Sequence, residues 1–249
     1  MCRLQVRTVW LEVPCFTELG SLRTDNWPQL MTWVKICGMT NLEDALVAVE
    51  AGADAVGFVF YEKSPRCVSV ETAREIAEKL PEGVEKVGVF VGSNVEKARD
   101  IFQRVGLTMA QVYGESIDEW YTWYESDQMK LMWAVPGSAL KEEFFIALGG
   151  SKKKITALLV DSGTGDRPGG TGMRFDWEGS KIGIWHLGSE IPIVVAGGLK
   201  PGNVNDAMKT LVPWGVDVVS GVEASPGKKD PEKVRAFVRA VREFDRRAS

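Results

Sequence analysis

The stretch EKVGVFVGSNVEKARDIFQRV, Glu85–Val105, carries the pattern that decides the fold. Its first part, 85–91, is short, apolar and rich in β-branched residues, which predicts a buried strand. After a Gly-Ser-Asn break, residues 94–105 place apolar side chains at helical spacing, which predicts an amphipathic helix. A buried strand followed at once by a helix is the repeating unit of a parallel α/β sheet.

The same unit recurs along the chain. Strands are expected at 33–37, 54–60, 85–91, 108–112, 129–135, 155–161, 191–196 and 215–220. The helices expected after them are 41–51, 70–80, 94–105, 116–126, 139–148, 175–189, 201–211 and 230–244. Eight such units in roughly 215 residues predict an α/β fold, a single-domain (β/α)8 TIM barrel. An open doubly wound sheet is the alternative, which the absence of a G-x-G-x-x-G turn after the first strand disfavours.

Composition excludes several classes of protein. The chain has 249 residues, 45% of them hydrophobic, and a net charge of −4, so no overall basic field attracts nucleic acid. We expect no membrane association, because no apolar run is long enough to span a bilayer. The N-terminal residues lack the basic, apolar and small-residue order that is typical of a signal peptide. Cys2, Cys15, Cys37 and Cys67 form no C-x-x-C pair, which indicates reduced thiols in a cytoplasmic protein. The single histidine, His186, excludes a mechanism built on a histidine pair.

The expected barrel domain covers residues 32–249, and residues 1–31 form an N-terminal extension. The extension has weak periodicity and turn signals such as Asp25-Asn26 and Trp27-Pro28. A wrongly assigned start, an extra capping segment and a flexible arm remain open as interpretations.

Two strand ends carry candidate catalytic side chains. Active sites of these barrels lie at the carboxyl ends of the strands, where Cys37 ends the first strand and Asp161 ends the sixth. These strands are three steps apart around the ring, so their ends face each other across the mouth. A thiolate can act as a general base and a carboxyl of raised pKa as a general acid. The structural alternatives are a small core cysteine and an aspartate that caps a turn.

Three glycine-rich loops follow the last three expected strands. Glycine lets the backbone approach a ligand closely, so that several amide N–H groups can converge on a phosphate. In this fold the phosphate site commonly uses the loops after the seventh and eighth strands. The sequence therefore predicts a phosphate site, with tight turns as the plainer alternative. The candidate residues are Gly170, Thr171, Gly172, Gly197, Gly198, Ser220 and Gly221.

Four motifs together resemble the phosphoribosylanthranilate isomerase family of tryptophan biosynthesis. They are VKICGMTNLEDALVAVEAGADAVGFVFYEKSPRCVS, DSGTGDRPGGTGMRFDW, VAGGLKPGNV and SGVEASPGKKD, and the likeness covers about Thr32 to Phe244. The resemblance implies a (β/α)8 barrel without metal or organic cofactor and with a small phosphorylated substrate. It implies conversion of N-(5′-phosphoribosyl)anthranilate to 1-(o-carboxyphenylamino)-1-deoxyribulose 5-phosphate by an Amadori rearrangement. Either a monomer or a homodimer is compatible with it.

The resemblance also implies a role for individual residues. Cys37 matches the general base that removes the C2′ proton, and Asp161 matches the general acid that protonates the furanose ring oxygen. Arg66, in KSPRCVS, matches the arginine that holds the anthranilate carboxylate, and the glycine loops match the phosphate cradle. After the fourth strand the family usually reads Q-L-H-G, and here QVYG retains Gln111 as a substrate-binding candidate but has Tyr113 in place of the histidine.

Two other functions are weighed against this one. An isomerase that also accepts the analogous aminoaldose of histidine biosynthesis would usually carry two aspartates on the first and fifth strands, and Cys37 argues against it. A barrel that binds a phosphorylated sugar without turnover is the second alternative. Retention of Cys37, Asp161 and Arg66 together argues against it.

Overall fold

The computed structural model describes residues 2–6, 9–13, 31–92, 94–114, 120, 129–140, 144, 148, 155–163, 172–188 and 190–248. The chain divides into two compact units, Met1–Met31 with Ser249, and Thr32–Ala248. In the first unit, β1 (Cys2–Val6) and β2 (Val9–Val13) pair as an antiparallel two-stranded sheet. The weak periodicity of that segment did not predict these strands.

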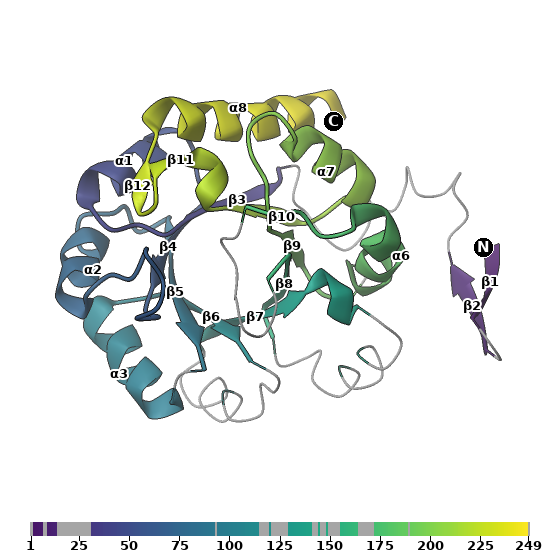
Figure 1. Ribbon diagram of the computed structural model, residues 1–249, viewed down its shortest axis with the longest axis horizontal. Helices are drawn as coiled ribbons and strands as arrows, with labels where there is room; N and C mark the ends of the chain where they lie inside the picture. Colours follow the sequence, from purple (N-terminus) through teal and green to yellow (C-terminus); the bar gives the residue numbers. More distant parts are fainter. Residues whose placement is uncertain are drawn as a thin grey trace. The chain divides into compact units, whose positions relative to one another are not determined.

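Eight parallel strands of the second unit close into a barrel, in the order β10-β3-β4-β5-β6-β7-β8-β9 (Figure 1). The pairing of β10 with β3 closes the ring. The fold class predicted from the sequence is therefore confirmed, and the open sheet is excluded. Every expected strand is present, with ends that shift by two residues at most. Their bounds are β3 (Trp33–Cys37), β4 (Ala55–Val59), β5 (Glu85–Val91), β6 (Met109–Tyr113), β7 (Lys130–Pro136), β8 (Ala157–Asp161), β9 (Ile193–Val195) and β10 (Gly215–Val218).

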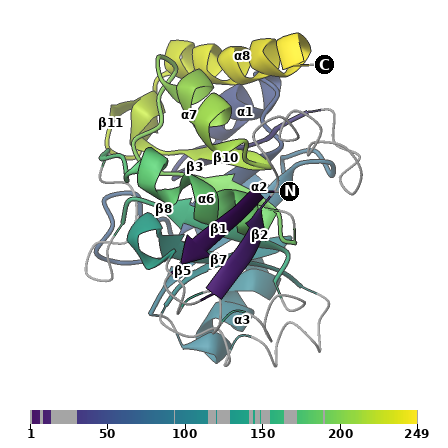
Figure 2. The same ribbon diagram turned by 90° about the vertical axis from the view of Figure 1, so that its right-hand side faces the viewer.

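The described helices surround the ring (Figure 1). They are α1 (Leu42–Glu50), α2 (Val70–Ala77), α3 (Val95–Val105), α6 (Trp177–Gly188), α7 (Val204–Leu211) and α8 (Pro231–Ala248). The first three begin where the sequence places a capping side chain, since Asn41, Ser69 and Asn94 each accept a hydrogen bond from a backbone N–H of the first turn. From the side, α8 lies next to α1 and α7 (Figure 2).

Two expected helices, 116–126 and 139–148, lie outside the described residues apart from a few single positions. Directly after β7 the structure has a short 3-10 turn, η1 (Gly137–Ala139), so a regular helix does not begin at residue 139. Most of the glycine-rich loop after β8 also lies outside the described residues, including Gly170 and Thr171.

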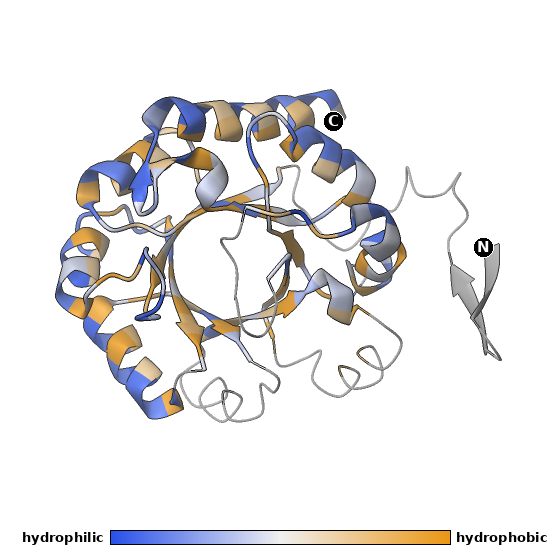
Figure 3. Ribbon diagram, viewed as in Figure 1, coloured by the Kyte–Doolittle hydropathy of each residue, from blue (hydrophilic) through white to orange (hydrophobic). Residues whose placement is uncertain are grey.

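Side chains of each strand alternate between two apolar layers. On β3, Val34 and Ile36 pack outward against the helices, whereas Trp33 points into the barrel interior. The interior layer is closed by side chains from other strands, among them Met109 and Leu159. This packing fills the barrel and leaves the carboxyl ends of the strands as the place for a site. The colouring in Figure 3 shows apolar residues along the ring and on the inner faces of the helices. In the described part of the chain, no helix is both long and apolar enough to cross a bilayer.

Candidate active site

A pocket opens at the carboxyl ends of the strands. It brings together seven of the residues predicted from the sequence, contributed by six of the eight strands and the loops that follow them. They are Cys37, Arg66, Gln111, Asp161, Gly197, Gly198 and Ser220. Tyr61, Tyr113 and Asp217 also line it. Gly172 and Gly221 are described but are not among its lining residues.

Cys37 is at once packed and part of the pocket wall. It is 3% exposed and contacts Val59 and Val89 in the apolar layer just below the mouth. Gly57, its neighbour across β4, leaves space for the sulfur, because a Cβ there would lie 2.5 Å from Cys37 Sγ. Burial raises the pKa of the Cys37 thiol, and the nearby Lys35 ammonium opposes that rise. Cys37 is therefore both a small packed core residue and a residue that lines the pocket.

A buried ion pair that is not evident from the sequence lies beneath the site. Lys35 is fully buried, and its Nζ donates hydrogen bonds of 2.9 Å each to Asp217 Oδ1 and Gln111 Oε1. Burial favours a lower pKa for Lys35, but Asp217 and Cys37 outweigh it and the pKa is raised. The sequence does contain a sign of this ion pair, because one charged residue lies inside each of the apolar strands WVKIC and GVDV. The closure of β10 on β3 makes the two residues direct neighbours.

Asp161 faces the pocket at the end of β8 and is held by hydrogen bonds from Tyr113 and Ser162. Tyr113 Oη donates to Asp161 Oδ2 at 3.0 Å, and the backbone N–H of Ser162 donates to Oδ1 at 2.6 Å. Gln111 Nε2 in turn donates to Tyr113 Oη at 3.3 Å. Burial raises the pKa of Asp161, and the hydrogen bonds from Tyr113 and Ser162 oppose part of that rise. A carboxyl of raised pKa holds its proton closer to neutral pH, as a general acid must.

Tyr113 is a neutral hydrogen-bond donor in this arrangement. Burial, followed by the charge of Asp161, raises its pKa well above the ordinary value of 10.0. The phenol therefore keeps its proton and presents it to the carboxylate form of Asp161. The tyrosine that departs from the Q-L-H-G pattern is thus in direct contact with the candidate acid.

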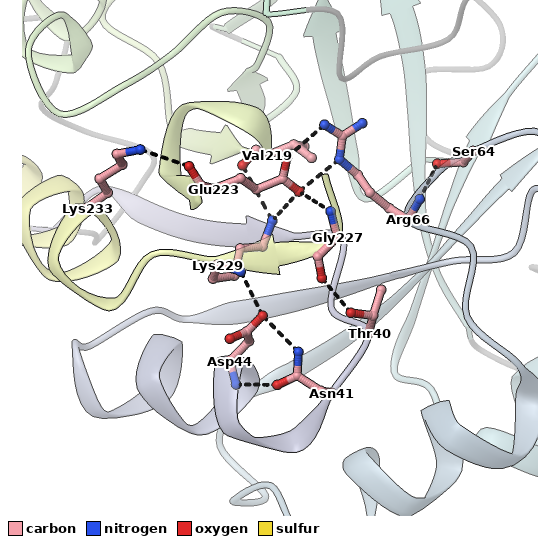
Figure 4. A network of polar contacts seen from close by, with 10 residues as sticks. All are labelled: Thr40, Asn41, Asp44, Ser64, Arg66, Val219, Glu223, Gly227, Lys229 and Lys233. Carbon is pink, nitrogen blue, oxygen red and sulfur yellow. Dashed lines mark hydrogen bonds and ion pairs between the residues drawn. The ribbon is translucent and has the colours of Figure 1, made fainter. Parts of the chain in front are cut away.

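Arg66 reaches the pocket from the loop between β4 and α2, where it is 12% exposed. Its Nε and Nη2 atoms donate to Glu223 Oε1 and Oε2 at 2.9 and 2.8 Å, as Figure 4 shows. Gly38 makes room for it, because a Cβ at that position would lie 3.0 Å from Arg66 Cδ. The hydrogen bonds to Glu223 raise the pKa of the guanidinium further. Glu223 belongs to the SGVE motif, but its pairing with Arg66 was not predicted.

The glycine loops after β9 and β10 press against their neighbours. Gly197 has φ +80°, and a Cβ there would lie 2.6 Å from the backbone nitrogen of Ser162. A Cβ on Gly221 would lie 1.8 Å from Leu199 O, so the two loops are in backbone contact. Asn203 Nδ2 donates to Gly198 O at 3.0 Å and steadies the loop after β9. Close approach of backbone to backbone at the pocket edge explains why these positions are glycine.

The site has no cluster of metal ligands among the residues that the structure describes. His186 lies within α6 and does not line the pocket. The functional groups that line the pocket include a thiol, two carboxyls, two phenols, a carboxamide and a guanidinium.

Comparison with known proteins gives a consistent result. A family model described as N-(5′-phosphoribosyl)anthranilate (PRA) isomerase matches residues 34–240. An N-(5′-phosphoribosyl)anthranilate isomerase of Citrifermentans bemidjiense is 44% identical over 208 residues, which are 84% of this chain and 96% of the relative. One from Geobacter sp. is 46% identical over 208 residues, 84% of this chain and 97% of the relative.

Solved structures agree with these relatives. A phosphoribosyl anthranilate isomerase from Thermotoga maritima superposes with a TM-score of 0.74 at 39% identity, covering 86% of this chain and all (100%) of that one. A phosphoribosyl anthranilate isomerase in complex with reduced 1-(o-carboxyphenylamino)-1-deoxyribulose 5-phosphate has a TM-score of 0.71 at 38% identity, covering 86% of this chain and 100% of that one.

Proposed function

Because this chain belongs to the N-(5′-phosphoribosyl)anthranilate isomerase family, we propose that it converts N-(5′-phosphoribosyl)anthranilate to 1-(o-carboxyphenylamino)-1-deoxyribulose 5-phosphate in tryptophan biosynthesis. The observation that carries the proposal is the shared pocket of Cys37 and Asp161, on strands three steps apart, with Arg66 at its rim. A base and an acid on opposite sides of one sugar-sized pocket suit an aldose–ketose rearrangement.

Two anchors orient the substrate in this proposal. The phosphate is bound by backbone amides of the loops after β9 and β10, around Gly197, Gly198, Ser220 and Gly221. The anthranilate carboxylate is bound by Arg66, whose planar guanidinium matches a carboxylate in a two-point contact. Gly172 belongs to the same corner as the phosphate loops, because a Cβ on it would lie 3.5 Å from Ser220 Oγ. With both ends held, the ribose spans the space between Cys37 and Asp161.

The acid step opens the sugar ring. Asp161 gives its proton to the ring oxygen, the bond from that oxygen to C1′ breaks, and the lone pair of the anthranilate nitrogen forms a C1′=N iminium. Asp161 is left as a carboxylate, and the hydrogen bond from Tyr113 stabilises it. Tyr113 is in this sense a positioning residue for the acid.

The base step forms the product. The Cys37 thiolate removes the proton from C2′, the electron pair of that C–H bond forms C1′=C2′, and the nitrogen recovers its lone pair. The resulting enolamine takes up a proton at C1′ and loses the one on its C2′ hydroxyl, which yields the ketone. Lys35, held by Asp217 below the sulfur, favours the thiolate electrostatically. Exchange with water at the mouth returns the enzyme to its starting protonation.

The decisive experiment measures turnover of freshly generated substrate by the loss of its fluorescence. Purified protein should show turnover, and Cys37→Ala and Asp161→Asn should each abolish it. Both variants should keep their affinity for the reduced product analogue, because neither residue belongs to the two anchors. Tight binding of the analogue by a wild-type protein without turnover would contradict the proposal and favour the non-catalytic sugar-phosphate barrel.

A further inference from the structure

Glu223 occupies one edge of the Arg66 guanidinium. A guanidinium offers five N–H donors, and Glu223 takes the Nε–Nη2 edge with two hydrogen bonds of 2.9 and 2.8 Å. Nη1 donates to no side chain among the described residues, and Nη2 has a second N–H that points to the same side as Nη1. Arg66 lines the pocket, whereas Glu223 does not. Arg66 can therefore meet a ligand through one remaining two-point edge while Glu223 stays bound behind it.

A second cation completes the cluster. Lys229 Nζ lies 3.2 Å from Glu223 Oε1, and its side chain is fully buried. Burial alone favours a higher pKa for Glu223, but the hydrogen bond from Arg66 and the charge of Lys229 outweigh it, so the pKa is lowered. Burial lowers the pKa of Lys229, and the ion pair with Glu223 opposes that effect. With Arg66 and Lys229 protonated and Glu223 ionised, the three groups sum to one positive charge.

The cluster is anchored from several sides, as Figure 4 shows. The two short strands β11 (Glu223–Ser225) and β12 (Lys228–Lys229) pair with each other and carry Glu223 and Lys229. Gly227 N donates to Glu223 Oε1 at 3.2 Å, and Lys233 Nζ donates to Glu223 O at 2.9 Å. Lys229 N donates to Asp44 Oδ2 at 2.7 Å at the start of α1. Glu223 is therefore held in place when a ligand reaches Arg66.

We propose that Glu223 restricts the Arg66 corner to a group with one negative charge, a carboxylate, and disfavours a phosphate dianion there. A carboxylate on the free edge of Arg66 matches the single net positive charge of the cluster. A dianion carries one more negative charge, and the Glu223 carboxylate on the other side of the guanidinium repels that charge. The second charge therefore adds little binding free energy. This inference rests on the proposed function, and it identifies Glu223 as the group that sets which charge the substrate may carry beside Arg66.

The test compares two ligands that differ only at this corner. The first is the reduced product analogue with its aryl carboxylate, and the second has a phosphonate dianion in place of that carboxylate. Calorimetry gives the ratio of their dissociation constants for each variant. Wild type should favour the carboxylate, and Glu223→Gln should shift the ratio toward the phosphonate by roughly tenfold or more, because one negative unit charge is removed from the far edge of the guanidinium that binds the ligand. Lys229→Met, which leaves the Arg66–Glu223 contact intact, should shift the ratio the opposite way.

Glu62→Gln is the matched control. It removes the same charge from the loop that carries Arg66, but Glu62 is 91% exposed and lies 4.0 Å from its nearest partner, Lys97. The ratio of the two dissociation constants measured for Glu62→Gln should equal the ratio measured for wild type. If Glu223→Gln does not fold, Lys229→Met alone decides. An unchanged ratio in both cluster variants overturns the inference while turnover by wild type continues to support the proposed function. Failure of wild type to bind the carboxylate ligand would count against the proposed function instead.

Discussion

Replacing Tyr113 by phenylalanine removes one hydroxyl group from the active site. That hydroxyl donates to Asp161 Oδ2 at 3.0 Å, and the hydrogen bond lowers the pKa of the carboxyl relative to what burial alone produces. A hydrogen bond to a charged group contributes about 1.5–3 kcal/mol. Since one pKa unit corresponds to about 1.4 kcal/mol, Tyr113→Phe should raise the pKa of Asp161 by about one to two units.

The consequence is a shift of one limb of the pH–rate profile. In the proposed mechanism turnover requires protonated Asp161 together with ionised Cys37, and the thiol is the weaker acid of the two. The productive form is then a minor protonation state of the enzyme. Its fraction is constant at pH values between the two pKa values and decreases at pH values below the pKa of Asp161. The acid limb of kcat/KM therefore reports Asp161, and Tyr113→Phe should move its midpoint to higher pH by about one to two units.

The assay is the pH dependence of kcat/KM, followed by substrate fluorescence for both proteins with the same substrate preparation. Ionisation of the substrate contributes equally to both profiles and cancels in the comparison. Tyr61→Phe removes a phenol from the same pocket, and no described hydrogen bond joins the Tyr61 hydroxyl to Asp161. That control should keep the wild-type acid limb. An acid limb that stays in place in Tyr113→Phe would refute the assignment of Asp161 as the acid positioned by Tyr113.

Three further predictions concern the groups around this pair. Lys35→Met should lower the free energy of unfolding by about 3–5 kcal/mol in urea titrations, because Asp217 stays buried without its ion-pair partner. Gly57→Ala should destabilise the fold by about 1–3 kcal/mol and reduce kcat, because its Cβ would overlap the Cys37 sulfur; an active variant of wild-type stability would contradict this packing. In the folded protein the pKa of Asp161 is raised, so the folded state binds more protons than the unfolded state above pH 3.8, and stability falls as pH rises toward the folded-state pKa. Asp161→Asn should remove this pH-dependent loss of stability. In urea titrations from acid to neutral pH, the free energy of unfolding of the variant should therefore increase relative to that of wild type.

Much of the barrel was predictable because its signals are local. Each strand is a short apolar run and each described helix an apolar face at helical spacing, so their order along the chain already predicted a ring. Cys37 and Asp161 could be named as candidates since they end strands three steps apart. The extent of the helices expected at 116–126 and 139–148 stays a prediction, as do the positions of Gly170 and Thr171.

The contacts that tune the site were not predictable in the same way. Arg66 and Glu223 are 157 positions apart, and Lys35 and Asp217 are 182 apart. Nothing local signals such pairs, because a charged residue in one segment is compatible with many partners elsewhere. The contact between Tyr113 and Asp161, 48 positions apart, likewise exists only once β6 and β8 share a ring.

The amino-acid sequence by itself determined the alternation of strand and helix, the strand ends that carry a thiol and a carboxyl, and the glycines that permit close backbone approach. Only the tertiary structure decided which charges neutralise one another, which donor holds Asp161 and which edge of Arg66 is left for a ligand. The physical reason is that hydrophobic periodicity acts over a few residues, whereas a buried charge finds its partner only where closure of the barrel brings distant strands together.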